Sequence, residues 1–146
     1  MLSSCLSQKT VTESKNTEIS KLTDQQLMDK VQKDALKYFW EYAEPNSLLG
    51  RERYHEDNIY PQNDKHVVTT GGSGFGLATV LVGVERGFIP REEAVKRLNT
   101  MMDFLAKADR FHGAWSHWIH GETGKVVPFG RKDNGGDLVE TAFLTS

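Results

Sequence analysis

The chain has 146 residues, of which 38% are hydrophobic and 26% are charged, proportions typical of a globular protein of about one domain. Its formal net charge is -2, with both signs interspersed, so nucleic acid is excluded as an expected partner. The sequence contains no run of about 18 apolar residues and therefore predicts no membrane-spanning helix.

The first residues resemble a lipid-attachment signal. Cys5 is the single cysteine, and Leu2-Ser3-Ser4-Cys5 resembles the lipobox of bacterial lipoproteins, in which the cysteine is acylated. Such a box normally follows a basic and an apolar segment, so we expect the true start to lie upstream of Met1. The alternative is a free cysteine in a disordered start. Residues 1–21 are thus expected to be a lipoprotein-like terminus and flexible tether in the periplasm or at the cell surface of a bacterium, with the lipid as the only membrane contact.

The expected folded part, residues 22–146, begins with an amphipathic helix. Thr23 and Gln26 have the spacing of a capping box, which predicts the helix start. Pro45 is expected to stop this helix. Between them, apolar residues recur at helical spacing: Leu27, Val31, Ala35, Tyr38, Phe39 and Tyr42.

Two more helices are expected after a long polar connection. Residues 77–84 are apolar on all sides and predict a helix that is buried all round. The glycine-rich residues 71–76 before it lack the spacing and the lysine of a phosphate loop. Gly87 is expected to end this helix and Pro90 to open the next, which is amphipathic and ends near Ala108.

A second long connection follows Ala108. Trp115, His117 and Ile119 alternate before a turn at 121–124, which predicts a small hairpin completed by residues 126–127. A last apolar helix is expected to start near Asp137 and to be still running at residue 146.

The order of the helices predicts an all-α fold. Two amphipathic and two wholly apolar helices alternate, and a double ring of outer and inner helices satisfies both kinds. Both long loops would then lie on the face where the inner helices begin, as functional loops often do. A closed ring needs about a dozen helices, so the four expected here would be part of a larger domain.

Three carboxylates stand at the start of the last helix. Asp137 and Glu140 share one helical face, and Asp133 can converge on them from the preceding turn. Crowded carboxylates can separate their proton affinities and become an acid and a base. The alternative is structural: Asp137 is a good helix cap and Glu140 has the position of its capping-box partner.

Aromatic and hydrogen-bonding residues fill the two long loops and suit sugar rings, which have apolar faces and hydroxyl edges. Candidates for stacking are Tyr54, Trp115 and Trp118, although for each aromatic taken singly local packing is the favoured alternative. The histidines do not match a zinc spacing, and no metal or other cofactor is expected.

Three motifs resemble the bacterial glycoamylase-like domain of glycoside hydrolase family 144, whose members include endo-β-1,2-glucanases. They are VVTTGGSGFGLA (67–78), GAWSHWIHGETG (113–124) and DNGGDLVETAFL (133–144). The resemblance implies an (α/α)6 toroid, of which this chain would be the amino-terminal part, and an inverting hydrolase of β-linked glucan.

The resemblance also implies roles for individual residues. Asp133, Asp137 and Glu140 would lie in the substrate cleft, where these acidic positions matter for hydrolysis. From the residues themselves, His117 and Arg131 are further candidates for substrate contact. Inversion needs two carboxyls roughly 6.5 to 9.5 Å apart. Adjacent turns of one helix are closer, so we expect an essential partner beyond residue 146. A non-catalytic glycan-binding lipoprotein and an inactive truncated chain are the alternatives, and the sequence leaves the linkage preference, endo or exo action and oligomeric state open.

Overall fold

The computed structural model describes residues 19–146, so Cys5 and the lipobox-like segment lie outside the described residues. The chain divides into two units, one ending at Asp34 and one comprising Ala35–Ser146. Helix α2 (Asp24–Trp40) contains the boundary. The candidate site lies in the second unit.

The start of α2 has the expected capping box. The backbone N–H of Thr23 donates to Gln26 Oε1 at 2.9 Å, and the N–H of Gln26 donates to Thr23 Oγ1 at 3.3 Å. The helix ends at Trp40, so the expectation that it continues to Pro45 is wrong. Tyr42 instead lies in a turn, where its ring stacks on Tyr54.

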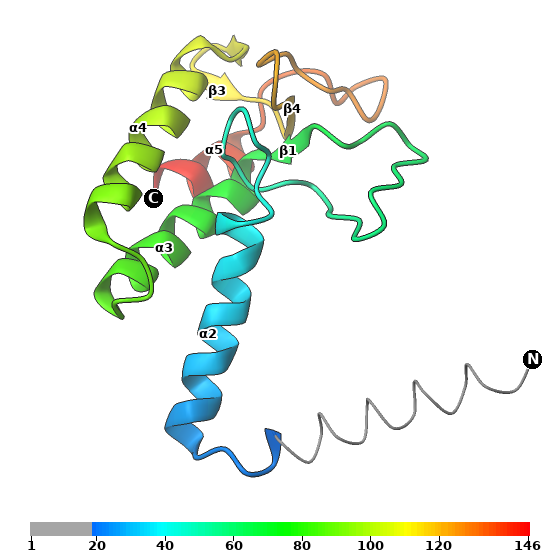
Figure 1. The fold of residues 1–146 in the computed structure, drawn as a ribbon. Coiled ribbons are helices and arrows are strands. Elements are labelled where there is room, and N and C mark those ends of the chain that lie inside the picture. Colours follow the sequence, from blue (N-terminus) through cyan, green and yellow to red (C-terminus); the bar gives the residue numbers. More distant parts are fainter. Residues whose placement is uncertain (1–18) are drawn as a thin grey trace, which may run out of the picture. The chain divides into compact units, whose positions relative to one another are not determined.

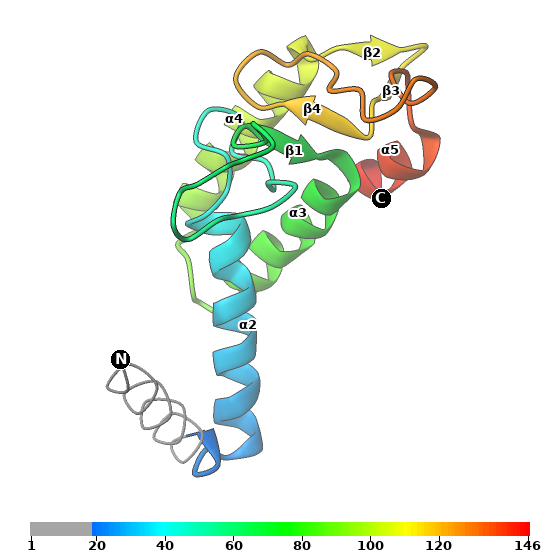
Figure 2. The same cartoon turned by 90° about the vertical axis from the view of Figure 1, so that its right-hand side faces the viewer.

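The second unit is mainly helical with two small antiparallel sheets, which agrees with the predicted helical class apart from the sheets (Figures 1 and 2). Its remaining helices are α3 (Thr70–Glu85), α4 (Arg91–Lys107) and α5 (Leu138–Thr145). Its strands are β1 (Val67–Thr69), β2 (Arg110–Phe111), β3 (Ala114–Trp115) and β4 (Trp118–His120).

Helix α3 begins earlier than its apolar run indicates, because the glycine-rich residues form its first turns rather than a preceding loop. Glycine disfavours helix by about 1 kcal/mol relative to alanine, so a tertiary cause is needed. At Gly74 a Cβ would lie 1.9 Å from the carbonyl oxygen of Phe143, within α5. The missing side chain therefore lets the backbones of α3 and α5 meet, as Figure 1 shows.

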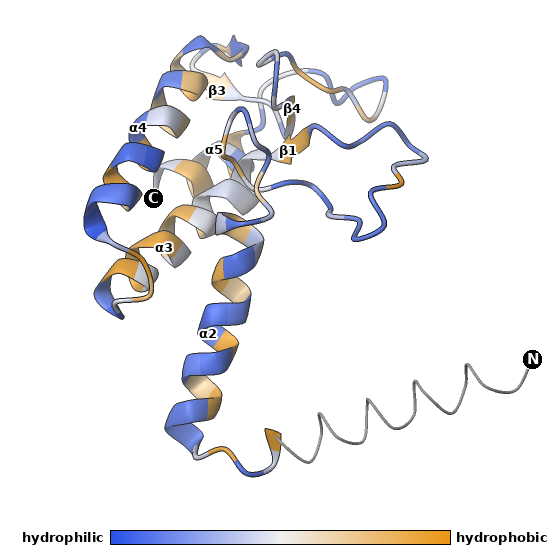
Figure 3. Cartoon of the chain, viewed as in Figure 1, coloured by the Kyte–Doolittle hydropathy of each residue, from blue (hydrophilic) through white to orange (hydrophobic). Residues whose placement is uncertain are grey.

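Helix α3 is not buried all round among the described residues. Val80 and Gly83 are buried against Leu36 and Ile89, but Leu81 is 62% exposed. The expectation of complete burial is wrong for this structure because α4, α5 and the end of α2 cover only part of the helix (Figure 3). No helix of the described residues is long and apolar enough to cross a membrane.

The connection between α3 and α4 follows the prediction. Gly87 has a φ of +68°, and the N–H of Phe88 donates to the carbonyl of Gly83, which closes the helix end. Pro90 is the N-cap residue of α4. One face of α4 is buried through Ala94 and Met101, and the rest of its surface is largely hydrophilic (Figure 3).

The two sheets differ from the expected single hairpin. Trp118–His120 forms β4, and the hairpin with 126–127 is reduced to one bridge, between Ile119 and Val126. The main partner of β4 is the distant strand β1, with Ile119 opposite Val68. Trp115 lies instead in a separate β2–β3 hairpin (Figure 2).

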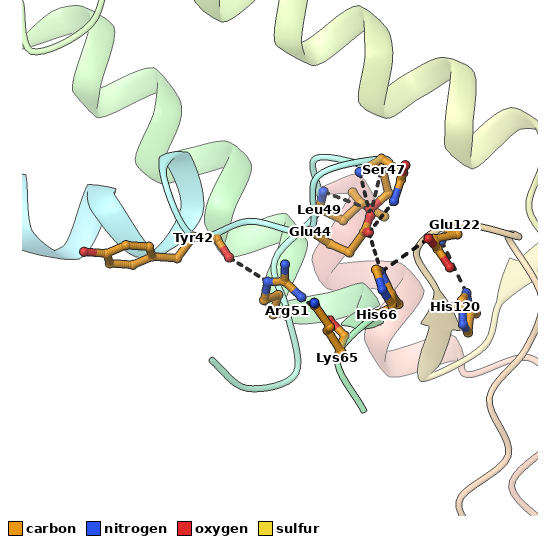
Figure 4. A network of polar contacts seen from close by, with 10 residues as sticks. Tyr42, Glu44, Ser47, Leu49, Arg51, Lys65, His66, His120 and Glu122 are labelled. Carbon is orange, nitrogen blue, oxygen red and sulfur yellow. Dashed lines mark hydrogen bonds and ion pairs between the residues drawn. The ribbon is translucent and has the colours of Figure 1, made fainter. Parts of the chain in front are cut away.

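A buried carboxylate fixes the connection between α2 and the β1–β4 sheet. Glu44 is fully buried and accepts hydrogen bonds from the backbone and hydroxyl of Ser47, from Asn46 and from His66 Nδ1 at 3.0 Å (Figure 4). A Cβ on Gly121 would lie 2.5 Å from the carboxyl carbon of Glu44. The carboxylate thus joins the turn after α2 to the end of the sheet where β1 starts and β4 stops.

Candidate functional site

The candidate site is built at the start of α5, where Asp137 is the N-cap residue. Its Oδ1 accepts the backbone N–H of Val139 at 2.9 Å and that of Glu140 at 3.0 Å. The hydrogen bond from Glu140 is the largest cause that lowers the pKa of Asp137, and His117 and Val139 act in the same direction against the effect of burial. The carboxylate of Asp137 is therefore held in its ionised form.

Glu140 caps a different helix from the one on which it lies. Its Oε2 accepts the backbone N–H of Gly71 at 2.7 Å and lies 3.4 Å from Thr69 Oγ1, at the start of α3. The expected capping box with Asp137 is wrong, because the N–H of Asp137 donates to the carbonyl of Trp115. An anionic group at a helix N-terminus is favourable, so Glu140 stabilises α3 from α5.

His117 connects the β1–β4 region to this carboxylate. Its Nδ1 lies 3.1 Å from Asp137 Oδ2, and the two side chains are 35% and 31% exposed. The ring of His117 is held by edge contacts with Trp118 and Phe129. Asp137 therefore has fixed partners on both carboxylate oxygens and still faces solvent.

A hollow of about 280 Å³ opens beside Asp137. It brings Asp133, Asp137 and His117 together. Its lining consists of His117, Phe129, Lys132, Asp133, Gly135, Gly136, Asp137 and Leu138. Glu140 does not line this hollow, so two of the three predicted carboxylates meet there and the third faces α3.

Asp133 owes its position to a tight turn. Its backbone N–H donates to the carbonyl of Gly130, and a Cβ on Gly130 would lie 2.5 Å from Asp133 Oδ2. The missing side chain at residue 130 lets the carboxylate fold back over the turn. Asp133 is exposed, whereas Asp137 is half-buried.

The other predicted substrate contacts do not line the hollow. The indole N–H of Trp115 donates to the carbonyl of Leu105, and its ring packs on the core. Trp118 packs against Phe129, with ring centroids 4.4 Å apart. Tyr54 stacks on Tyr42 in the other long loop, and Arg131 is exposed beside the hollow's Lys132.

Phe129 and Lys132 are among the lining residues that sequence reasoning did not name as site residues. Phe129 stands alone between Pro128 and Gly130, without periodicity or a motif to mark it. Only the fold brings it to His117 and Trp118. Among residues 19–146, no group of three or more His, Cys, Asp or Glu side chains is arranged to hold a metal ion.

Comparison with known proteins gives β-1,2-glucan hydrolases and proteins described as putative glucoamylases. No protein-family model matches the chain. The exo-β-1,2-glucooligosaccharide sophorohydrolase (non-reducing end) of Parabacteroides distasonis is 56% identical over 124 residues, 84% of this chain and 16% of that protein. The chain is homologous to bacterial β-1,2-glucan hydrolases. This finding confirms the resemblance that three sequence motifs predicted.

Solved structures agree with this relationship. The endo-β-1,2-glucanase of Chitinophaga pinensis, solved with sophorotriose and glucose, matches with a TM-score of 0.82 and 58% identity over 84% of this chain and 29% of its own. The β-1,2-glucanase of Parabacteroides distasonis matches with a TM-score of 0.76 and 53% identity over 84% of this chain and 17% of its own. The chain thus spans between 16% and 29% of the length of these relatives.

Proposed function

We propose that this chain belongs to a glycoside hydrolase that acts on β-linked glucan, with β-1,2-glucan as the substrate. The observation that carries the proposal is the placement of Asp137 beside an open hollow, next to Glu140 at the start of α3, in a chain homologous to β-1,2-glucanases. The charge pattern of the hollow suits a neutral, hydroxyl-rich ligand.

The hydrogen bonds favour different catalytic roles for Asp137 and Glu140. Asp137 is kept ionised, so it suits accepting a proton from water or from a sugar hydroxyl. Glu140 also accepts hydrogen bonds, from Gly71 and Thr69, and is therefore suited to positioning. The proton donor to the leaving oxygen is then a different group. An inverting enzyme holds its acid and base carboxyls roughly 6.5 to 9.5 Å apart, so the donor should be a more distant carboxyl.

We propose the (α/α)6 toroid as the architecture, with α3 and α5 among its inner helices and α2 and α4 among its outer ones. In support, α3 and α5 expose apolar side chains that water disfavours. These residues are Phe75, Leu81, Val82, Leu138, Val139 and Phe143. The amphipathic character of α4 suits an outer position.

We also propose that residues 1–21 form a tether acylated at Cys5, which would place the protein in the periplasm or at the cell surface. The lipobox-like sequence before Cys5 supports this. Metabolic labelling with a radioactive fatty acid should label the protein, and Cys5→Ser should abolish the label. Equal labelling of both would contradict the anchor.

Hydrolysis by two variants tests the catalytic proposal. Asp137→Asn retains a good helix cap, so we expect nearly unchanged stability but turnover of β-1,2-glucan reduced about 100-fold or more. Glu140→Gln keeps one acceptor oxygen for Gly71 and should also lose turnover. Wild-type rates in both variants would refute the proposed roles.

The same experiment separates hydrolysis from binding alone. A glycan-binding protein is favoured by the fact that both carboxylates already accept backbone hydrogen bonds. It would show thermal stabilisation by the oligosaccharide and release no product. Nuclear magnetic resonance of fresh product would report whether an active protein inverts the anomeric centre.

A further inference from the structure

Phe129 lies in the hollow beside Asp137 and takes no part in the proposed proton transfer or positioning. Its side chain is 50% exposed, although it packs on one side against the rings of Trp118 and His117, with centroids 4.4 and 5.1 Å away. An exposed aromatic side chain that is held by two other rings is a rigid apolar surface. Because its orientation is already fixed, binding a ligand there would cost little side-chain entropy.

The remainder of the hollow narrows the kind of ligand. An anionic ligand would face the carboxylates of Asp133 and Asp137, with Lys132 as the single cation of the lining. A wholly apolar ligand would remove water from those carboxylates without replacing its hydrogen bonds, which is costly. A neutral ring with one apolar face and hydroxyl groups on its edge avoids both penalties.

We propose that Phe129 is a stacking platform for one glucosyl unit of a β-1,2-glucooligosaccharide, with Asp133 and Lys132 bonding to its hydroxyl groups. The proposal rests on the proposed function and assigns Phe129 a binding role within it. The volume of about 280 Å³ lies just below the roughly 300–1,000 Å³ typical of small-molecule sites. The hollow therefore takes part of an oligosaccharide rather than all of it.

The test measures binding of sophorotriose by calorimetry in a Glu140→Gln background. The proposed function expects this change to remove turnover. Because Glu140 does not line the hollow, the change should leave the surface of Phe129 unaltered. Phe129→Leu keeps an apolar side chain but loses the flat ring, and should weaken binding about threefold to tenfold. Phe129→Tyr keeps the ring and should bind within about twofold of the parent.

A matched control truncates an exposed apolar side chain elsewhere. Met102 is 60% exposed on α4 and does not line the hollow, so Met102→Ala should leave the dissociation constant unchanged. Equal affinity of Phe129→Leu and its parent would overturn the proposal, as would an absence of binding when Phe129 is present. Failure of the proposed function is a separate result, namely wild-type protein that binds sophorotriose and cleaves no β-1,2-glucan.

Discussion

The contact between α3 and α5 offers the sharpest test of how this fold positions its carboxylates. In Gly74→Ala the new Cβ would lie 1.9 Å from the carbonyl oxygen of Phe143 and 2.9 Å from the Cα of Leu144. Both neighbours are backbone, so no side chain can rotate away. Real Cβ contacts are almost never shorter than 3.0 Å, so the helices must separate by about 1.1 Å.

The expected cost follows from two opposing effects. Alanine in a helix interior gains about 1 kcal/mol over glycine. Overpacking of a tight contact costs about 1–3 kcal/mol, and backbone neighbours favour the upper end. Gly74→Ala should therefore lower the free energy of unfolding by about 2 kcal/mol.

Urea unfolding followed by circular dichroism measures this difference. Gly135→Ala is the matched control, because a Cβ there would meet no atom within 4 Å, and it should be neutral or stabilising by up to about 1 kcal/mol. Since α5 carries both Asp137 and Glu140, a displacement near 1 Å should also reduce hydrolysis about 100-fold. A Gly74→Ala protein as stable as the control would refute the argument from close backbone approach.

Two further predictions concern ionisable groups. Burial opposes ionisation of Glu44, but hydrogen bonds from Ser47, His66 and Asn46 lower its pKa below the ordinary 4.5. The ionised Glu44 therefore stabilises the fold above pH 4.5, and this stabilisation is lost as the pH falls through the pKa of Glu44 in the folded protein. Glu44→Gln should lower stability at neutral pH by about 2–3 kcal/mol and flatten this acid dependence; unfolding curves from pH 3 to 7 that parallel wild type would contradict it. His117→Phe removes one cause of the lowered pKa of Asp137, so the acidic limb of the pH profile of kcat/KM should move to higher pH. The shift should be only partial, because the hydrogen bond from the N–H of Glu140 remains. An unmoved limb would exclude His117 as a partner of Asp137.

Several local features could be predicted because they depend on residues close in sequence. The capping box of Thr23 and Gln26, the stop at Gly87 and the cap at Asp137 each involve residues within a few positions of one another. Local backbone geometry determines whether such hydrogen bonds can form. The sequence therefore indicated where most helices start or stop.

The candidate site was only partly predictable. Asp133, Asp137 and Glu140 were expected to converge, and the hollow contains the first two but not Glu140. The partner of Glu140 was not predictable, because Gly71 lies 69 residues earlier in the chain. The spacing of Asp137 and Glu140 in the sequence fits a local capping box equally well. Trp115 was placed in a sugar site because its pattern cannot distinguish an exposed ring from one that packs on a core.

By itself, the sequence determined the mainly helical class, the order of the helices and the relationship to β-1,2-glucanases, since periodicity and motifs are properties of neighbouring residues. Only the tertiary structure decided that the glycine-rich segment is helical and that Glu140 caps α3. It also decided that Phe129 faces the hollow. The physical reason is that these features depend on backbone approach and on hydrogen bonds between segments far apart in the chain, where intrinsic propensity is outweighed by packing.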